Sequence, residues 1–421
     1  MTQSSSKLSS KQLPDLKPLF WAGFCFWTSL ASLLPTLPLY IRDIGGNGHQ
    51  VGFVMGAFAI GLLGSRAWVG HLADERSRKV VLLLGMGVAA IAPVGYALFE
   101  NIWILGAFRA FHGISIAAFG TAYSALVVDL SPSDRRGRVM GVMSLVQPLG
   151  VALGPAIGGL MQAQMGYIQL FVMSALLAMV GFICTIGVYD PMAVKSDGVK
   201  PEPNPIPPPL EQSVWQIVWS PRLRIPTIVM LLVGLAFGLI ASYVPLYMGE
   251  TVSNLNAGVF YTAAAIASFS LRMSVGKASD RLGRGVFITF GLVCYLLAMV
   301  VLWQAQSEFS FIGAGLLEGC GGGILIPMMA TLMADRSQAF ERGRVFSLCM
   351  GGFDMGIAIA GPAFGILATE GRYGQLFGVG GICVGVGLVL FLTCSSQSLR
   401  SSFAFALGRG RDVYALEDIR V

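Results

Sequence analysis

The sequence has few charged residues. Asp, Glu, Lys and Arg together make up 12% of the 421 residues, whereas a water-soluble domain carries roughly a quarter. Residues of the AVILMFWYC class account for 55% of the chain. Several stretches, such as 171–189 and 228–248, are apolar on nearly every side and long enough to cross about 30 Å of hydrocarbon. This composition excludes an ordinary soluble protein and predicts a membrane protein.

The sequence also lacks the patterns that hold metals, disulfides or catalytic groups. It contains three His and seven Cys. All seven Cys fall within apolar segments, with no close pair and no Cys/His pattern. It contains no nucleophile–base set and no nucleotide-binding loop. We therefore expect no disulfide, no metal, no cofactor and no enzymatic activity.

Twelve apolar segments are predicted to span the membrane. The first 17 residues lack the apolar core of a cleavable signal peptide, so we expect the first span to direct insertion. The predicted spans are 18–41, 51–72, 79–99, 102–128, 139–163, 167–189, 225–248, 254–275, 285–305, 309–333, 345–368 and 374–395.

The positive charges indicate the topology of these spans. Most of the 28 Lys and Arg residues lie in the two tails, the middle segment and every second loop. The alternate loops hold Arg42 and Arg372, and Arg66, Arg109 and Arg272 lie within spans. By the positive-inside rule, both termini and the middle segment are cytoplasmic. This placement argues against a nucleic-acid partner despite the net charge of +6.

The two halves of the chain are related by an internal repeat. A shift of 206 residues places Arg66 on Arg272 and Asp129 on Asp335. Two six-span halves that start on the same side form a parallel repeat, with a solute site expected near the midplane between them. We predict an all-α membrane protein of twelve helices in two six-helix bundles. Its parts are a cytoplasmic tail (1–17), a bundle (18–189), a Pro-rich cytoplasmic linker (190–224), a second bundle (225–395) and a cytoplasmic tail (396–421).

The turns after spans 2 and 8 share one pattern. Gly70, Asp74 and Arg78 of the first turn correspond to Gly276, Asp280 and Arg284 of the second. Glycine allows close helix contact, and an Asp can face the positive N-terminal end of a neighbouring helix. The basic residues can meet anionic head groups or pair with a carboxylate.

With both copies of this turn present, the chain resembles the major facilitator superfamily, whose loop signature is G-x-L-A-D-R-x-G-R-K. The resemblance covers about residues 18–395 and implies the major facilitator fold. In that family the loop Asp and Arg form a cytoplasmic gate with an Asp at the end of span 4. The resemblance implies a gate of Gly70, Asp74, Arg78, Asp129, Asp280, Arg284 and Asp335. The first copy departs from the signature at Glu75 and Ser77.

Span 4 carries Arg109, His112 and Gly113, similar to the family's R-x-x-Q-G signature, whose Arg is tied to proton coupling. A charge at this depth is costly and normally faces the bundle interior or a wet cavity. Arg109 could instead be a structural strut bonded to backbone carbonyls. His112 stands where Gln is usual, and it is either a group that titrates near neutral pH or a polar packing residue.

Span 5 matches the family's G-x8-G-x3-G-P-x2-G-G pattern in full. This pattern, the antiporter motif of exporters, consists here of Gly141, Gly150, Gly154, Pro155, Gly158 and Gly159. Glycines four residues apart line one helix face and let another helix approach closely. The proline is expected to bend the span. The motif is a packing device, so it suggests export without determining the direction.

Two carboxylates lie well inside spans, Glu318 in span 10 and Asp354 in span 11. A carboxyl group shielded from water can hold a proton near neutral pH and release it on exposure, as a proton-coupled carrier requires. Alternatively, each could be a polar group satisfied by neighbouring backbone. We assign proton coupling to Asp354, Glu318, Arg109 and His112. The expected cavity wall includes Phe26, Trp27, Tyr123, Gln147, Phe237 and Tyr243.

These features favour a secondary active transporter that exports lipophilic or amphiphilic compounds by alternating access in exchange for protons, as a multidrug efflux protein of the cell inner membrane does. A dedicated exporter of one metabolite (a siderophore or sugar) and a proton-coupled uptake symporter remain alternatives. A sensor or scaffold on a transporter fold is a third class, without an extra soluble domain to support it. Expected partners are a small-molecule solute, protons and membrane lipids, and we expect a monomer.

Overall fold

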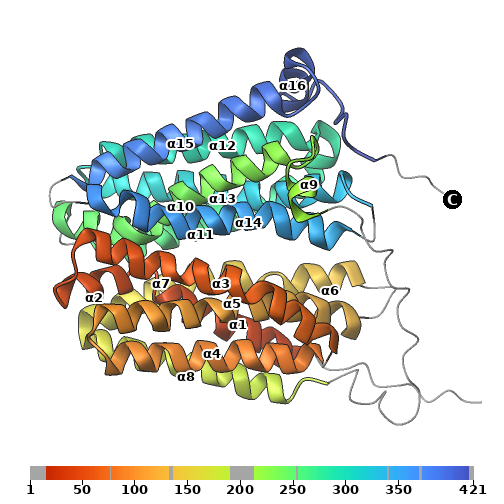
Figure 1. The fold of residues 1–421 in the computed structure, drawn as a ribbon. Coiled ribbons are helices and arrows are strands. Elements are labelled where there is room, and N and C mark those ends of the chain that lie inside the picture. The colour runs from red at the N-terminus through yellow and green to blue at the C-terminus, as the bar shows by residue number, and fades with distance from the viewer. Residues whose placement is uncertain are drawn as a thin grey trace, which may run out of the picture.

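The computed structural model describes residues 16–75, 77–131, 136–189, 213–252, 255–338, 341–368 and 372–416, leaving aside the side chains at 74–75, 136–138, 214, 273–277 and 280–281. The ordered elements in these ranges are helices (Figure 1). Residues 1–15 of the predicted N-terminal tail and 190–212 of the predicted linker lie outside the described residues. The remaining part of the linker region contains a short helix, α9 (Val214–Val218).

The first half of the chain forms one helical bundle. Its elements are α1 (Lys17–Ser32), α2 (Leu37–Asp43), α3 (Gly48–Glu75), α4 (Arg78–Leu98), α5 (Ile102–Leu130), α6 (Arg136–Met143), α7 (Val146–Met165) and α8 (Tyr167–Ile186). The second bundle contains α10 (Arg224–Thr251), α11 (Gly258–Leu282), α12 (Arg284–Trp303), α13 (Glu308–Asp335), α14 (Arg342–Phe364) with the 3₁₀ turn η1 (Gly365–Leu367), and α15 (Tyr373–Cys394). The two bundles lie against each other along their length (Figure 1).

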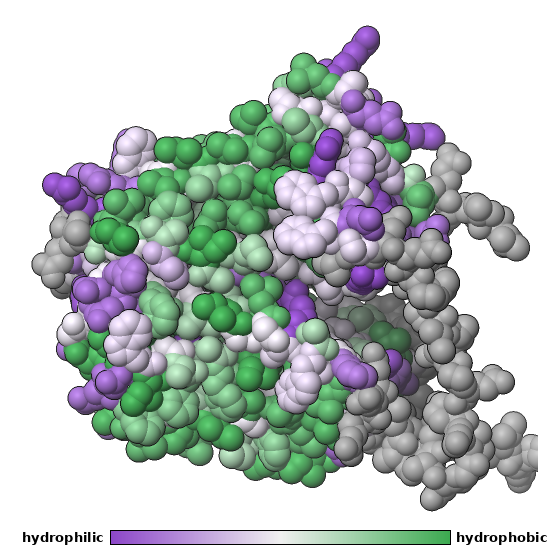
Figure 2. Space-filling model, in the orientation of Figure 1, coloured by the Kyte–Doolittle hydropathy of each residue, from purple (hydrophilic) through white to green (hydrophobic). Residues whose placement is uncertain are grey.

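The twelve predicted spans are present as helices. Among the described residues, eleven segments are long and apolar enough to cross a membrane, when α1–α2, α6–α7 and α14–η1 each count as one. The twelfth, α11, is 25 residues long and packs against α7 and α13. Hydrophobic residues cover the middle of the visible face, and hydrophilic residues gather toward its two ends (Figure 2). This distribution matches a protein whose sides face lipid and whose ends face water.

Two of the spans are broken by proline. The first span divides between Ser32 and Leu37, where Pro35 and Pro38 lie close together. The fifth divides at Ser144 and Leu145. Pro148 follows that break and has no N–H to donate to the carbonyl of Ser144, so a helical hydrogen bond is lost there.

The C-terminal region contains a helix that packs against the second bundle. Helix α16 (Leu399–Ala406) packs against α12 and α15. A Cβ added at Gly285 would clash with the carbonyl oxygen of Phe405, so the backbones of α12 and α16 lie close together here. Thr289 Oγ1 also donates a hydrogen bond of 2.9 Å to the carbonyl oxygen of Ala406. The predicted cytoplasmic tail at 396–421 therefore contains a helix, which the sequence pattern did not reveal because it is only eight residues long.

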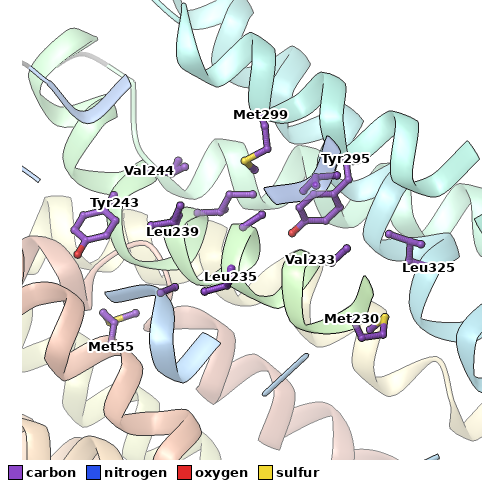
Figure 3. Packing of buried hydrophobic residues seen from close by; sticks show 14 of the residues in the cluster. Met55, Met230, Val233, Leu235, Leu239, Tyr243, Val244, Tyr295, Met299 and Leu325 are labelled. Atoms are coloured by element: carbon purple, nitrogen blue, oxygen red, sulfur yellow. The ribbon is translucent and has the colours of Figure 1, made fainter. Parts of the chain in front are cut away.

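The buried apolar side chains form two clusters. The smaller cluster lies within the first bundle. The larger one fills the second bundle and extends into the first, so that Met55 of α3 belongs to the same cluster as Leu235 and Leu239 of α10 (Figure 3). Apolar packing therefore joins the two halves as well as filling each of them.

Candidate solute-binding cavity

A cavity of about 320 Å³ lies between the two bundles. Its walls come from α1, α3, α5 and α7 of the first bundle and from α10 to α14 of the second. Most of the lining side chains are apolar. The charged residues of the lining are Arg109, Arg272, Glu318 and Asp354. A mainly apolar cavity with a few convergent polar groups is the usual form of a small-molecule site.

Three of the six predicted wall residues, Trp27, Gln147 and Phe237, line this cavity. Phe26, Tyr123 and Tyr243 do not line this cavity. The first two pack on either side of Phe119, with ring centroids 4.1 and 4.6 Å from its ring. Successive residues of a helix point about 100° apart, so Trp27 faces the cavity while its neighbour faces the bundle core.

Tyr243 lies at a different contact between the halves. Its hydroxyl donates a hydrogen bond of 3.1 Å to the carbonyl oxygen of Gly48 at the start of α3. The side chain is fully buried. This tyrosine therefore joins α10 to α3 beyond the end of the cavity.

Asp354 forms an ion pair that joins the two bundles. Its carboxylate on α14 accepts a hydrogen bond of 2.6 Å from Nη2 of Arg66 on α3. Nη1 of Arg66 donates to the carbonyl oxygen of Ser347, at 3.3 Å. Asp354 is 7% exposed, and a buried carboxylate requires such a partner.

Glu318 and Arg109 also line the cavity but make different contacts. The hydroxyl of Tyr295 donates to Oε1 of Glu318 at 3.4 Å. The guanidinium carbon of Arg109 lies 4.4 Å from the centre of the Phe58 ring, a cation–π contact. Nε and Nη1 of Arg109 are buried without a hydrogen-bond partner among the described residues.

His112 does not itself line the cavity, but its ring contacts Phe58, over which the guanidinium of Arg109 lies. The side chain is fully buried, and Nδ1 lies 3.1 Å from the hydroxyl of Tyr96 on α4. Its contacts with Tyr96 and Phe58 place the ring between α3, α4 and α5. In this conformation it is a packing residue between α3, α4 and α5.

Among the gate side chains that the structure describes, one ion pair is formed in each bundle. Arg78 pairs with Asp129, linking α4 to α5. Arg284 pairs with Asp335 at 3.3 Å, linking α12 to α13. These pairs are equivalent under the repeat, and each joins helices of the same half.

The remaining gate residues are less defined. The side chains of Asp74 and Asp280 lie outside the described residues. A Cβ added at Gly70 would meet no atom of the described residues within 4 Å, so this glycine makes no close helix contact with them.

The glycines of the span 5 motif pack mainly against α1. A Cβ at Gly150 would lie 2.5 Å from Cβ of Trp27, and one at Gly154 would lie 2.7 Å from the carbonyl oxygen of Thr28. Gly158 is equally close to the backbone of Ser32. Gly159 and Pro155 instead meet the second bundle at Asn256 and Gly258, whereas a Cβ at Gly141 would meet no atom within 4 Å. The motif thus brings α7 close to both α1 and α11.

The sequence did not assign Arg272, which lines the cavity, or Arg66, which pairs with a lining residue, to the site. Both were visible as arginines within equivalent spans. The sequence offered one signal for this pairing: few charges lie within the spans, and buried charges tend to be paired. It could not show which arginine pairs with Asp354, because packing sets the rotation of α3 relative to α14.

Known proteins resemble this chain in sequence and in fold. The sequence-family model of the Major Facilitator Superfamily matches residues 19–303 and 227–402 of this chain. The Multidrug resistance protein MdtG of Escherichia fergusonii is 29% identical over 84% of this chain and 87% of its own length. The MdtG protein of Citrobacter koseri is 28% identical over 88% of this chain and 91% of its own length.

Two solved structures have a similar fold at low sequence identity. The nucleoside transporter NupG superposes with a TM-score of 0.72 at 14% identity, covering 93% of this chain and 98% of that one. The peptide transporter POT, in complex with sulfate, superposes with a TM-score of 0.70 at 15% identity, covering 89% and 94%. Together with the twelve helices and the repeat, the family match shows that this chain is an integral membrane transporter of the major facilitator superfamily.

Proposed function

We propose that this protein exports small lipophilic or amphiphilic organic compounds across the cell inner membrane, in exchange for protons, by alternating access. The observation that carries the proposal is the placement of two buried carboxylates, Asp354 and Glu318, in the wall of an apolar cavity between two related bundles. The similarity to multidrug resistance proteins over most of the chain supports export rather than uptake.

The Arg66–Asp354 ion pair supplies a physical link between protons and conformation. It crosses from α3 to α14, so it stabilises an arrangement in which these helices lie together. A proton on Asp354 removes the charge of the carboxylate and weakens the attraction, which makes separation of the two helices less costly. Proton binding would thus shift the population between two arrangements of the bundles, as a coupled carrier requires.

Contacts between the bundles suggest which end is closed in this conformation. Gly48 lies against Ala368, and Gly52 lies against Gly361. These residues are at the ends of α3 and α14–η1 that are remote from α16 (Figure 1). With both termini in the cytoplasm, we propose that this conformation is closed on the outer side and receives solute from the inner side.

Transport in vesicles tests this function. Inside-out vesicles containing the full chain are expected to accumulate a lipophilic fluorescent dye when a proton gradient, acidic inside, is imposed. Asp354→Asn should abolish the dependence on the gradient, because the amide cannot take up a proton. Glu308→Gln is the matched control, since Glu308 is exposed at the start of α13, and it should transport normally.

Unchanged gradient-driven accumulation by Asp354→Asn would remove Asp354 from proton coupling. Absence of gradient-driven movement for every organic solute in a panel of cations, anions and neutral compounds would contradict the proposed function as a whole.

A further inference from the structure

The two seams between the bundles have the same register. One seam is formed by α3 and α14, the other by α11 and α7. A Cβ at Gly52 would lie 2.6 Å from the carbonyl oxygen of Gly361, and a Cβ at Gly258 would clash with the carbonyl oxygen of Pro155. Both members of these pairs are related by the repeat shift of 206 residues.

The equivalence continues one helical turn further along each seam. A Cβ at Gly56 would lie 2.9 Å from the carbonyl oxygen of Ala358. In the other seam, Oγ1 of Thr262 donates a hydrogen bond of 3.5 Å to the carbonyl oxygen of Ala152. These contacts also match under the same shift. The next charged position on α3 is Arg66, and its equivalent on α11 is Arg272.

At this position the symmetry breaks. Arg66 meets Asp354, but the residue of α7 equivalent to Asp354 is Pro148, which carries no charge. Pro148 and Arg272 both line the cavity. Nε of Arg272 is buried without a hydrogen-bond partner among the described residues. Within the described part of the chain, one seam therefore has a complete ion pair, and the other has a cation without a carboxylate partner.

The two carboxylates around the cavity both have partners. Asp354 forms an ion pair with Arg66, and Glu318 accepts a hydrogen bond from a tyrosine hydroxyl. Arg109 and Arg272 both have buried guanidinium nitrogens without partners among the described residues. An uncompensated cation in an apolar surrounding is unfavourable, and a bound anion with hydrogen-bond acceptors would stabilise it.

We propose that Arg272 binds the carboxylate of an apolar organic acid, at the place that a carboxylate of the protein occupies in the other seam. The inference rests on the proposed transport function and adds a substrate class to it. Arginine suits this role because its planar guanidinium can make two parallel hydrogen bonds to one carboxylate. The apolar part of the acid would lie against Trp27, Phe237 and Phe353, which line the same cavity.

Equilibrium binding to the purified full-length protein in lipid nanodiscs tests this assignment. The probes are naphthaleneacetate and its uncharged isostere naphthaleneacetamide. We expect the acid to bind about tenfold or more tightly than the amide, the difference typical of a charge-assisted hydrogen-bonded pair. Arg272→Gln should reduce binding of the acid to the level of the amide, and Arg272→Lys should retain part of the preference. Unchanged binding of the amide shows that each variant is folded.

A second pair of variants tests the symmetry argument itself. Pro148→Asp places a carboxylate where the second seam lacks one, so it should pair with Arg272 and abolish the preference for the acid. Pro148→Asn has a similar size without the charge and should keep that preference. Loss of the preference in both variants would indicate that the shape at Pro148, rather than its missing charge, matters.

Three results would overturn the assignment: equal binding of acid and amide to the unaltered protein, no binding of the acid, or a preference that survives Arg272→Gln. These measurements use no proton gradient. They can therefore fail while gradient-driven dye transport persists, in which case only the anion subsite is wrong. If no solute moves in vesicles, the transport function is wrong whatever the binding results.

Discussion

Single charged residues determine how the two bundles meet at the level of individual side chains. The isolated carboxylates Glu318 and Asp354 could be recognised from the sequence, because so few charges lie within the apolar spans. The partner of Asp354 could not, because Arg66 is 288 residues away along the chain. Phe26 and Trp27 show the same limit, since one helical step decides between the core and the cavity.

Removal of Arg66 is expected to destabilise the protein more than removal of the whole ion pair. Arg66→Gln leaves Asp354 buried without a partner, which costs up to about 3–5 kcal/mol when a buried pair is broken. The partial exposure of Arg66 places the effect at the lower end of that range. The double variant Arg66→Gln/Asp354→Asn should regain stability, because no uncompensated charge remains. Thermal unfolding in detergent measures this, and a double variant no more stable than Arg66→Gln contradicts it.

At the scale of elements, the second bundle has a network of ions that holds its ends together. Arg336 is almost fully buried, and its Nε and Nη2 donate to the two carboxylate oxygens of Asp412 at 2.7 and 2.9 Å. Arg222 makes a similar double contact with Glu341, at 2.6 and 3.1 Å. From the sequence, Arg222 and Arg336 counted only among the Lys and Arg residues expected on the cytoplasmic side. Their pairing joins segments after α16, before α10 and before α14, which a single sequence does not bring together.

Loss of the Asp412 carboxylate should release the segment that follows α16. Asp412→Asn leaves the guanidinium of Arg336 buried without its carboxylate partner, at a cost of about 3–5 kcal/mol. Amide hydrogen exchange should therefore rise in α16 and in residues 409–416. Arg411→Gln changes an exposed neighbour and is the matched control. Equal exchange in the two variants would show that the ion pair does not hold this segment.

The carboxylate of Glu341 should make the stability of the folded state depend on pH in the acidic range. Burial alone would raise the pKa of Glu341, but hydrogen bonds from Arg222 and the backbone of Gln338, with the charges of Arg222 and Arg344, hold the pKa below its ordinary value of 4.5. A lowered pKa in the folded state adds stability above the unfolded pKa, and this stability is lost as the pH falls through the folded pKa.

The test compares melting temperatures of the unaltered protein and Glu341→Gln. The difference in melting temperature should be largest near neutral pH and should vanish well below pH 4.5. A difference that is constant across this range would mean that the carboxylate charge of Glu341 does not contribute.

At the scale of the whole molecule, the repeat explains both the architecture and its asymmetry. The number of spans and the two related bundles could be predicted, because apolar length and the shift of 206 residues are properties of the sequence alone. The breaks at Pro38 and Pro148, the docking of α16 and the unequal seams depend on three-dimensional packing. The two seams enclose the cavity, and we propose that the bundles move about it during transport.

Distances between spin labels at the two ends of the bundles test that movement most directly. In a cysteine-free background, Asn101→Cys and Gln306→Cys label exposed loops remote from the termini, and His71→Cys and Gln338→Cys label exposed sites at the opposite end. Adding Asp354→Asn, which mimics the protonated carboxyl group, should lengthen the first distance and shorten the second. If both distances stay fixed, or change in the same direction, the two bundles do not open alternately to the two sides.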